Sequence, residues 1–256
     1  MFKGFILCDK RTGSTLLQNC LDSHPKITCY DELFMIRGKI KKRNGQYMYR
    51  WMKDNKSYNK KKFLNYLGEQ DENVYLKLIY DQCDYWKLEP YIRKNNLQVI
   101  HLFRKNHFKK AVSRLSRNNN KGQIDPITNI DVKKLVNEIL HSMEKSRIYK
   151  KKWEKHENQI KIYYEDMIGK KEGEIGEVKK VGAFNIKSNQ ITYLNKETCE
   201  KLCNFIGVEY FDMYSNITKR NKEDVLSYFN DREKRKIISL LKKVDLGKYL
   251  DEWGIV

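Results

Sequence analysis

One short segment near the start of the chain combines hydroxyl and basic side chains with a glycine, a composition that suits an anion. The segment DKRTGST, residues 9–15, lies between an apolar run at 3–8 and an amphipathic helix that we expect from Ser14. Gly13 allows a sharp turn, and the first amides of a helix favour negative charge. Arg11 adds a cation. The same residues also fit an ordinary turn with a hydroxyl cap, so this segment alone leaves both interpretations open.

This segment differs from the loop of nucleotide triphosphatases. Their motif is G-x-x-x-x-G-K-[ST], whereas here Gly4 lies nine residues before Gly13 and no lysine follows. The sequence also has no obvious magnesium-binding aspartate after a later strand. These differences argue against phosphoryl transfer from ATP, and a P-loop kinase of a small metabolite remains an alternative.

A second group of anion-binding side chains follows a later apolar run. Arg104 comes directly after residues 99–103, and Ser113 lies nine residues further on, in a segment with helical periodicity. A guanidinium and a hydroxyl on adjacent elements are what a second phosphate monoester needs. Taken singly, they also fit a solvated charge and a small residue inside a helix.

The elements that position these side chains alternate between short apolar strands and helices. We expect strands at 3–8, 27–30, 74–80, 99–103 and 160–164. We expect helices at 14–24, 84–94, 107–118, 131–155, 197–206 and 222–241. This alternation predicts an α/β fold with a P-loop-like parallel sheet and helices on both faces. Ligands of such sheets bind at the carboxyl ends of the strands, which directs attention to residues 9–15, 80–82, 104–113 and 165–166.

A single domain over residues 1–256 is expected, with a basic helical insertion at about 37–62. The insertion holds eleven Lys or Arg and one Asp, interleaved with aromatic residues. It fits a glycan or anionic acceptor, a nucleic acid, or simply a solvated surface. Residues 169–192 are rich in Gly, Lys and Glu and indicate a loop or small hairpin.

Composition narrows the class of protein further. The chain has 52 Lys and Arg against 33 Asp and Glu, a net charge of +19, which favours anionic partners. Six cysteines without a C-x-x-C pair argue against a zinc site and a disulfide framework, so we expect buried, reduced thiols. No apolar run approaches the roughly 20 residues of a membrane helix, and we expect a cytoplasmic protein without a membrane span.

Taken together, the motifs resemble the sulfotransferase family, and within it the bacterial carbohydrate enzymes of the nodulation-factor and trehalose type. The similarity lies in RTGSTLL after the first strand, then HP and ELF, and R-K-N-x(5)-V-S after a later strand. LKLIYDQ, IYYEDM and SNITKRN resemble further family segments. The pattern covers most of residues 3–120 and, more loosely, the C-terminal third. Residues 37–62 and 169–192 have no obvious counterpart.

The resemblance implies that the chain binds 3′-phosphoadenosine 5′-phosphosulfate (PAPS) and transfers its sulfonate to a hydroxyl, leaving adenosine 3′,5′-bisphosphate (PAP). Loop amides and basic side chains neutralise the leaving phosphate, so no metal is required. By similarity, the 5′-phosphosulfate is held by Arg11, Thr12, Gly13, Ser14, Thr15 and Leu16. Arg104 and Ser113 would hold the 3′-phosphate, and Lys219 loosely matches the C-terminal cofactor loop.

The acceptor hydroxyl must lose its proton as it attacks, which calls for a base near the loop. Glu32 matches the glutamate that serves as base in the carbohydrate-sulfating group, and Asp31 is the fallback. Other branches of the family use histidine as the base, so the rival candidates are His24, His101 and His107.

Two basic residues complete the catalytic set that the resemblance implies, Arg11 and Lys77. Lys77 either points toward the transferred sulfonate, turns outward to solvent or is paired with a carboxylate. Asp166, at the end of the IYYEDM segment, either belongs to the site or caps the next turn.

The implied partner is a small-molecule or glycan acceptor, without a stable nucleic-acid partner, and a homodimer is compatible with the sequence. The competing hypothesis from another class is a non-catalytic nucleic-acid-binding protein, which the net charge and the basic aromatic insertion favour. The two anion motifs after strands, with Glu32 between them, discriminate in favour of the enzyme, because nucleic-acid binding does not require them.

Overall fold

The computed structural model describes residues 2–34, 60–70, 73–119, 130–168, 192–215 and 229–255. The chain divides into two compact units, Met1–Phe103 with His156–Thr218 and Arg104–Lys155 with Lys219–Val256. The expectation of a single domain over 1–256 stays a prediction. Of the predicted basic insertion at 37–62, residues 37–59 lie outside the described residues. Of the predicted loop or hairpin at 169–192, residues 169–191 lie outside them.

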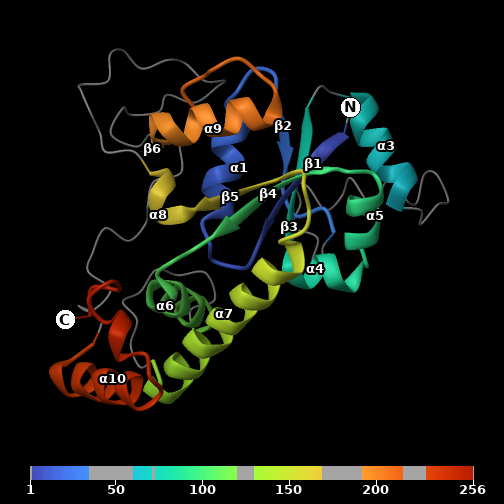
Figure 1. The fold of residues 1–256 in the computed structure, drawn as a ribbon. Helices are drawn as coiled ribbons and strands as arrows, with labels where there is room; N and C mark the ends of the chain where they lie inside the picture. The colour runs from blue at the N-terminus through green and yellow to red at the C-terminus, as the bar shows by residue number, and fades with distance from the viewer. Residues whose placement is uncertain are drawn as a thin grey trace. The chain divides into compact units, whose positions relative to one another are not determined.

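A five-stranded parallel sheet forms the centre of the first unit, in the order β2-β3-β1-β4-β5 (Figure 1). The strands are β1 (Phe2–Cys8), β2 (Thr28–Tyr30), β3 (Val74–Ile79), β4 (Gln98–Phe103) and β5 (Gln159–Tyr163). Each lies within one residue of its predicted bounds. β1 pairs with both β3 and β4, and Cys8 lies opposite Ile79 and Leu102, so these three strands end at one edge.

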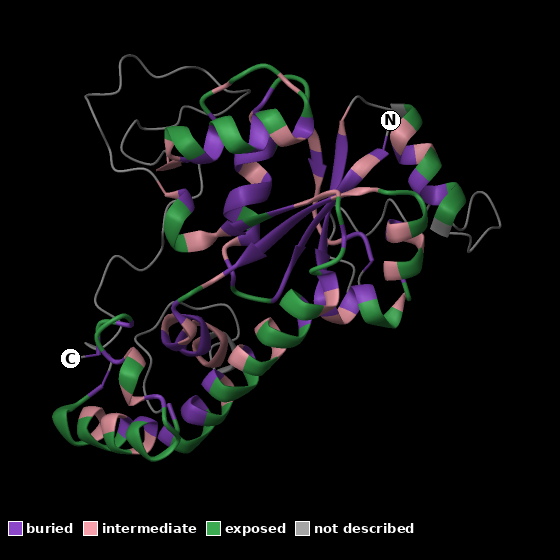
Figure 2. Cartoon of the chain, in the orientation of Figure 1, coloured by how far each residue is buried: buried purple, intermediate pink, exposed green. Residues whose placement is uncertain are grey.

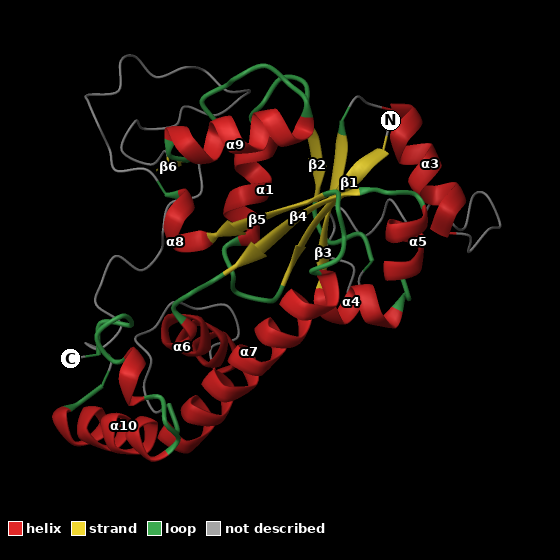
Figure 3. Ribbon diagram, viewed as in Figure 1, coloured by secondary structure: helices red, strands yellow, loops and turns green. Residues whose placement is uncertain are grey.

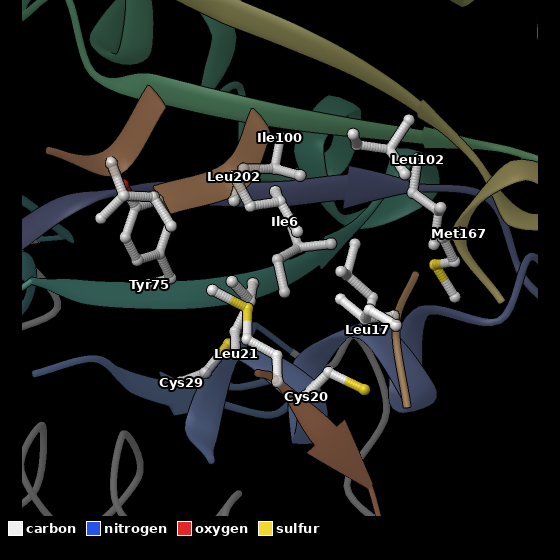
Figure 4. Packing of buried hydrophobic residues seen from close by; sticks show 14 of the residues in the cluster. Ile6, Leu17, Cys20, Leu21, Cys29, Tyr75, Ile100, Leu102, Met167 and Leu202 are labelled. Carbon is white, nitrogen blue, oxygen red and sulfur yellow. The ribbon is translucent and has the colours of Figure 1, made fainter. Parts of the chain in front are cut away.

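The first unit has helices α1 (Ser14–Asp22), α3 (Lys60–Gln70), α4 (Tyr80–Tyr85), α5 (Glu89–Lys94), α8 (Tyr164–Met167) and α9 (Lys196–Ile206). Helices α1 and α9 share one core with alternate residues of the central strands (Figures 3 and 4). This core includes Ile6 of β1, Ile100 of β4 and Leu202 of α9. The strands are buried over most of their length (Figure 2), as parallel sheets require. The predicted α/β class is therefore confirmed.

The helix predicted over 84–94 is wrong in its bounds, because the chain forms two short helices there, α4 and α5. Lys87 between them has φ 49, which interrupts a right-handed helix. Pro90 lies in the first turn of α5, where its missing N–H costs nothing, whereas inside a continuous helix it would clash. A small antiparallel pair, β6 (Thr192–Tyr193) with β7 (Tyr214–Ser215), was not predicted.

The second unit contains α6 (His107–Asn119), α7 (Val132–Trp153), α10 (Asp231–Lys243) and the 3₁₀ turn η3 (Gly247–Tyr249). Its own core includes Phe108, Leu135, Ile237 and Trp253. The predicted cap of α7 is confirmed, because Asp131 Oδ1 accepts hydrogen bonds from the amides of Lys133 at 2.8 Å and Lys134 at 3.3 Å. Helix α10 begins later than predicted, and residues 222–228 are not described.

All six cysteines are buried and free, as expected. Burial raises the pKa of the Cys8 thiol to about 11 and raises that of Cys20 still further. In the described parts of the chain, no helix is both long and apolar enough to cross a bilayer.

The close approach of β1 and β4 leaves no room for a side chain at Gly4, which can be tested by mutation. A Cβ placed there would meet the carbonyl oxygen of Gln98 at 1.9 Å, and this oxygen belongs to a paired strand that cannot move alone. We expect Gly4→Ala to lower the free energy of unfolding by about 2 kcal/mol or more, the usual effect of an overpacked core. Urea denaturation measures this.

Gly247→Ala is the matched control, because the tightest contact of its Cβ would be with Cγ of the Lys242 side chain, at 3.1 Å, which is able to move aside. The backbone Cα of Lys242 would lie at an ordinary contact distance of 3.6 Å. This control should be neutral or slightly stabilising. Equal effects of the two substitutions would contradict the steric account.

Candidate active site

The segment after β1 forms a tight turn that ends at the first residue of α1. Arg11 and Gly13 both have positive φ, 64 and 88, and Thr12 Oγ1 donates to the carbonyl of Asp9 at 2.8 Å. Gly13 is the N-cap residue and provides no side chain to cover the helix terminus. The amides of Leu16 and Leu17 donate to the Gly13 carbonyl at 3.0 and 3.1 Å, whereas those of Ser14 and Thr15 have no acceptor within the helix. The turn therefore presents these two donors and a positive dipole end to an anion.

Gly13 is also required by its neighbour Tyr164, the first residue of α8 after β5. A Cβ at position 13 would lie 2.1 Å from Cδ2 of the tyrosine ring. Both the left-handed backbone and the adjacent ring therefore exclude any side chain at this position. Tyr164 belongs to the IYYEDM segment that the sequence analysis singled out, but its contact with the loop was not predicted.

Lys77 lies in the middle of β3 and points toward the loop. Tyr75 and Ile79, two residues before and after it, belong to the core shared with α1, and alternation places Lys77 on the same face. Its Nζ donates to Thr15 Oγ1 at 3.3 Å, in the first turn of α1. Its side chain is only 4% exposed. An outward orientation to solvent is therefore excluded.

Two carboxylates neutralise this buried ammonium. Lys77 Nζ forms ion pairs with Asp31 and, at 3.3 Å, with Glu32 Oε1. The strand register explains the arrangement: Tyr30 at the end of β2 pairs with Leu76, so Asp31 comes next to Lys77. Burial by itself lowers the pKa of Lys77, but the charge and hydrogen bond of Asp31, helped by Glu32, outweigh it and raise the pKa above its ordinary value. The lysine is therefore cationic.

Glu32 has a second partner on the next helix. Its Oε2 accepts a hydrogen bond from Gln82 Nε2 at 3.0 Å, and Gln82 Oε1 in turn accepts from the Ile79 amide at 3.1 Å. The Glu32 side chain remains 27% exposed, so it reaches solvent as well as the buried lysine. The sequence marked residues 80–82 as a strand end, but gave Gln82 no role.

The histidines proposed as rival bases have other partners. His24 is 3% exposed, its Nδ1 accepts from the Lys26 amide at 3.0 Å, and its Nε2 lies 3.1 Å from the carbonyl of Glu209. His101 is fully buried in β4, with Nε2 2.7 Å from the Tyr80 hydroxyl. In the second unit, His107 Nδ1 contacts Ser142 Oγ at 2.8 Å. Glu32 and Asp31 are therefore the titratable groups joined to the loop through Lys77.

The remaining candidates belong to other segments of the chain. Arg104 directly follows β4 and Ser113 lies within α6, and both belong to the second unit and are partly buried. Their joint use as a 3′-phosphate site stays a prediction. Lys219 lies outside the described residues. The backbone carbonyl of Asp166 accepts from Thr198 Oγ1 at 3.4 Å and from the Asn195 side chain, contacts that tie α8 to α9.

Comparison with known proteins finds a family model that matches the N-terminal part of the chain. Residues 5–93 match the model of the Sulfotransferase family, and this segment contains the loop, Glu32, Lys77 and Gln82. A search among curated proteins gives no match.

Solved sulfotransferases share the fold. A sulfotransferase from Alicyclobacillus acidocaldarius superposes with a TM-score of 0.51 at 10% identity, covering 98% of this chain and 95% of that one. Mouse sulfotransferase SULT7A1, solved in complex with PAP, has a TM-score of 0.50 at 13% identity, covering 98% and 89%. The match to the Sulfotransferase family model is confined to residues 5–93, and the two solved structures share the fold of this chain.

The contact between Gly13 and Tyr164 predicts the result of a double-mutant cycle. Gly13→Ala should lower the free energy of unfolding by about 2 to 4 kcal/mol, because it adds a clash to a left-handed backbone. Tyr164→Ala removes the ring and hence the clash, so in that background Gly13→Ala should cost at least about 1 kcal/mol less. Urea denaturation of the four proteins measures the coupling, and strictly additive effects would refute the contact.

Proposed function

We propose that this protein is a PAPS-dependent sulfotransferase that transfers sulfonate to a hydroxyl of a carbohydrate, with Glu32 as the general base. One observation carries the proposal: Lys77 contacts Thr15 at the phosphate-type loop and Glu32 through the same ammonium group. The proposed base and the loop therefore contact the same lysine side chain. The region matched by the family model includes all three residues.

The donor site that we propose begins at the loop. Arg11 to Thr15, with Leu16 following, would hold the 5′-phosphosulfate through amides, hydroxyls and the guanidinium. The glycine at position 13 supports this fit, because it is the N-cap of α1 and has no side chain that would cap the first amides of the helix. Arg104, Ser113 and Lys219 are proposed for the 3′-phosphate end. When bound, PAPS supplies a sulfonate on a phosphate leaving group.

The chain's own groups would divide the work of transfer. Glu32 would accept the proton of the acceptor hydroxyl at a carboxylate oxygen, which its partial exposure allows an acceptor to reach. Lys77, cationic because of its two carboxylates, would stabilise negative charge beside Thr15. Arg11 would add charge at the rim of the loop.

A carbohydrate acceptor is proposed because the base is a carboxylate next to the loop. This arrangement agrees with the resemblance to the carbohydrate-sulfating branch. The basic aromatic insertion at about 37–62 would offer side chains that stack on sugar faces. A homodimer and a cytoplasmic location remain predictions from the sequence.

Ligand-dependent thermal stability tests the donor. We expect PAP to raise the melting temperature without added metal, by several degrees at about 100 times its dissociation constant. ATP with magnesium and a DNA duplex are the comparison ligands. A rise with ATP–magnesium but not with PAP would favour a kinase, and a rise with DNA alone would favour a nucleic-acid-binding protein. Incubation with labelled PAPS and a panel of glycans then identifies the acceptor.

Glu32→Gln tests the base, because it preserves size and removes basicity. Turnover should fall by roughly 100- to 10,000-fold, the usual contribution of a positioned base. Affinity for PAP should stay within a few-fold of the wild type, because Glu32 makes no proposed contact with the donor.

Asp31→Asn is the matched control, since it changes the other carboxylate on the same lysine, and it should keep most of the activity. Near-full turnover of Glu32→Gln, together with inactivity of a His24 or His107 variant, would show that the base is a histidine.

A further inference from the structure

The amide of Gln82 has only one orientation that satisfies its contacts. Gln82 lies in the first turn of α4, immediately after β3, and is 5% exposed. The Ile79 amide can only donate, so the atom 3.1 Å from it must be the carbonyl oxygen of Gln82. The NH₂ group is then the end that lies 3.0 Å from Glu32 Oε2. The backbone at the end of β3 therefore fixes a donor that is aimed at the carboxylate.

Together with Lys77, this contact occupies both oxygens of Glu32. Lys77 Nζ approaches Oε1 at 3.3 Å from the middle of β3, and Gln82 approaches Oε2 from the helix that follows the same strand. A carboxylate held at both oxygens is confined to one side-chain rotamer. Each oxygen keeps a lone pair that can accept a hydrogen bond from a substrate. Both holding groups come from a single stretch of chain, so they move together.

We infer that Gln82 is a positioning residue for Glu32, whose carboxylate it orients through the Nε2 hydrogen bond. The inference rests on the proposed function, in which Glu32 is the base. A cap for α4 would need only the Gln82 carbonyl, and the role of its NH₂ group is accounted for only by Glu32. Burial makes this neutral donor stronger, because water competes little for it.

Other charged or titratable groups also act on Glu32. Lys77 of β3 attracts it, Asp31 shares that lysine, and the Cys8 thiol at the end of β1 interacts with it electrostatically. Lys77 is divided between two carboxylates, whereas the Gln82 NH₂ group serves Glu32. Loss of this donor should leave the Glu32 carboxylate held at one oxygen, by Lys77, so that its orientation toward a substrate is less well fixed.

The test compares two substitutions of Gln82 with a control. Gln82→Glu keeps an oxygen for the Ile79 amide but replaces the donor by an acceptor, and Gln82→Met removes both contacts at similar size. Gln18→Met is the control, because Gln18 is another buried glutamine of this unit, on α1, whose Nε2 donates to the Cys29 carbonyl at 3.3 Å instead. Melting temperatures establish that each variant folds.

We expect both Gln82 variants to lower kcat by about tenfold or more, with the KM for PAPS within twofold, since one hydrogen bond to a charged group is lost. In the Glu32→Gln background, Gln82→Met should have no further effect on kcat. The Gln18 control should keep kcat within about twofold of the wild type.

A measurement without substrate keeps this inference separate from the proposed function. In ligand-free protein labelled with ¹³C-glutamate, the Glu32 carboxyl signal is assigned by its loss in Glu32→Gln and compared among the variants at one neutral pH. A changed carboxyl chemical shift in Gln82→Met, but not in Gln18→Met, supports the positioning role even if no sulfonate transfer is found. An unchanged carboxyl shift in Gln82→Met, or an equal rate loss in the Glu32→Gln background, overturns it.

Discussion

The buried ammonium of Lys77 is the interaction on which the site depends. A cation this far from water is destabilising by several kcal/mol unless it is paired, so the chain must bring negative charge to it. It does so through the parallel register of β2 and β3, which sets Asp31 and Glu32 beside the lysine. The same ammonium reaches the first turn of α1 at Thr15. One electrostatic requirement thus ties three chain segments to a common point.

The loop depends on a second constraint, which is steric. Position 13 accepts no side chain, since the backbone is left-handed and the Tyr164 ring fills the space. Helix α8 therefore shapes a loop about 150 residues earlier in the sequence. Figure 4 shows the apolar side of the same arrangement, where Leu17 of α1 and Met167 of α8 lie in one core with Ile6 and Leu102. The contact of Gly13 with Tyr164 and the shared core together fix the position of α8 relative to the loop and α1.

Much of the fold could be read from the sequence, because its signals are local. Short apolar runs such as residues 3–8 and 99–103 locate the strands to within one residue, and Asp131 marks the start of α7. The loop also stood out by residue type, whereas Glu32 was singled out by the resemblance to the carbohydrate-sulfating branch, and its role as base stays a prediction. The break between α4 and α5 was missed, although Pro90 carried a signal for it.

Parts of the site could not be predicted, because they arise from contacts between distant segments. Lys77 had three interpretations, and only the register of β2 against β3 decides among them. Gln82 differs from an ordinary surface glutamine only through the Ile79 amide and Glu32, fifty residues away along the chain. The ring of Tyr164 against Gly13 likewise has no counterpart in local patterns. Spacing identifies candidates, and tertiary contact assigns their geometry.

The burial of all six thiols has a practical consequence for spectroscopy. A thiol reacts with maleimide or iodoacetamide reagents through its thiolate, and burial both hides these sulfurs and disfavours that form, as the raised pKa of Cys8 illustrates. An exposed cysteine introduced by mutation, for instance at the 62% exposed Tyr85 on α4, would therefore be the preferred attachment point for a fluorophore or spin label. The native protein is thus already a suitable background for single-site labelling next to the loop-facing end of β3.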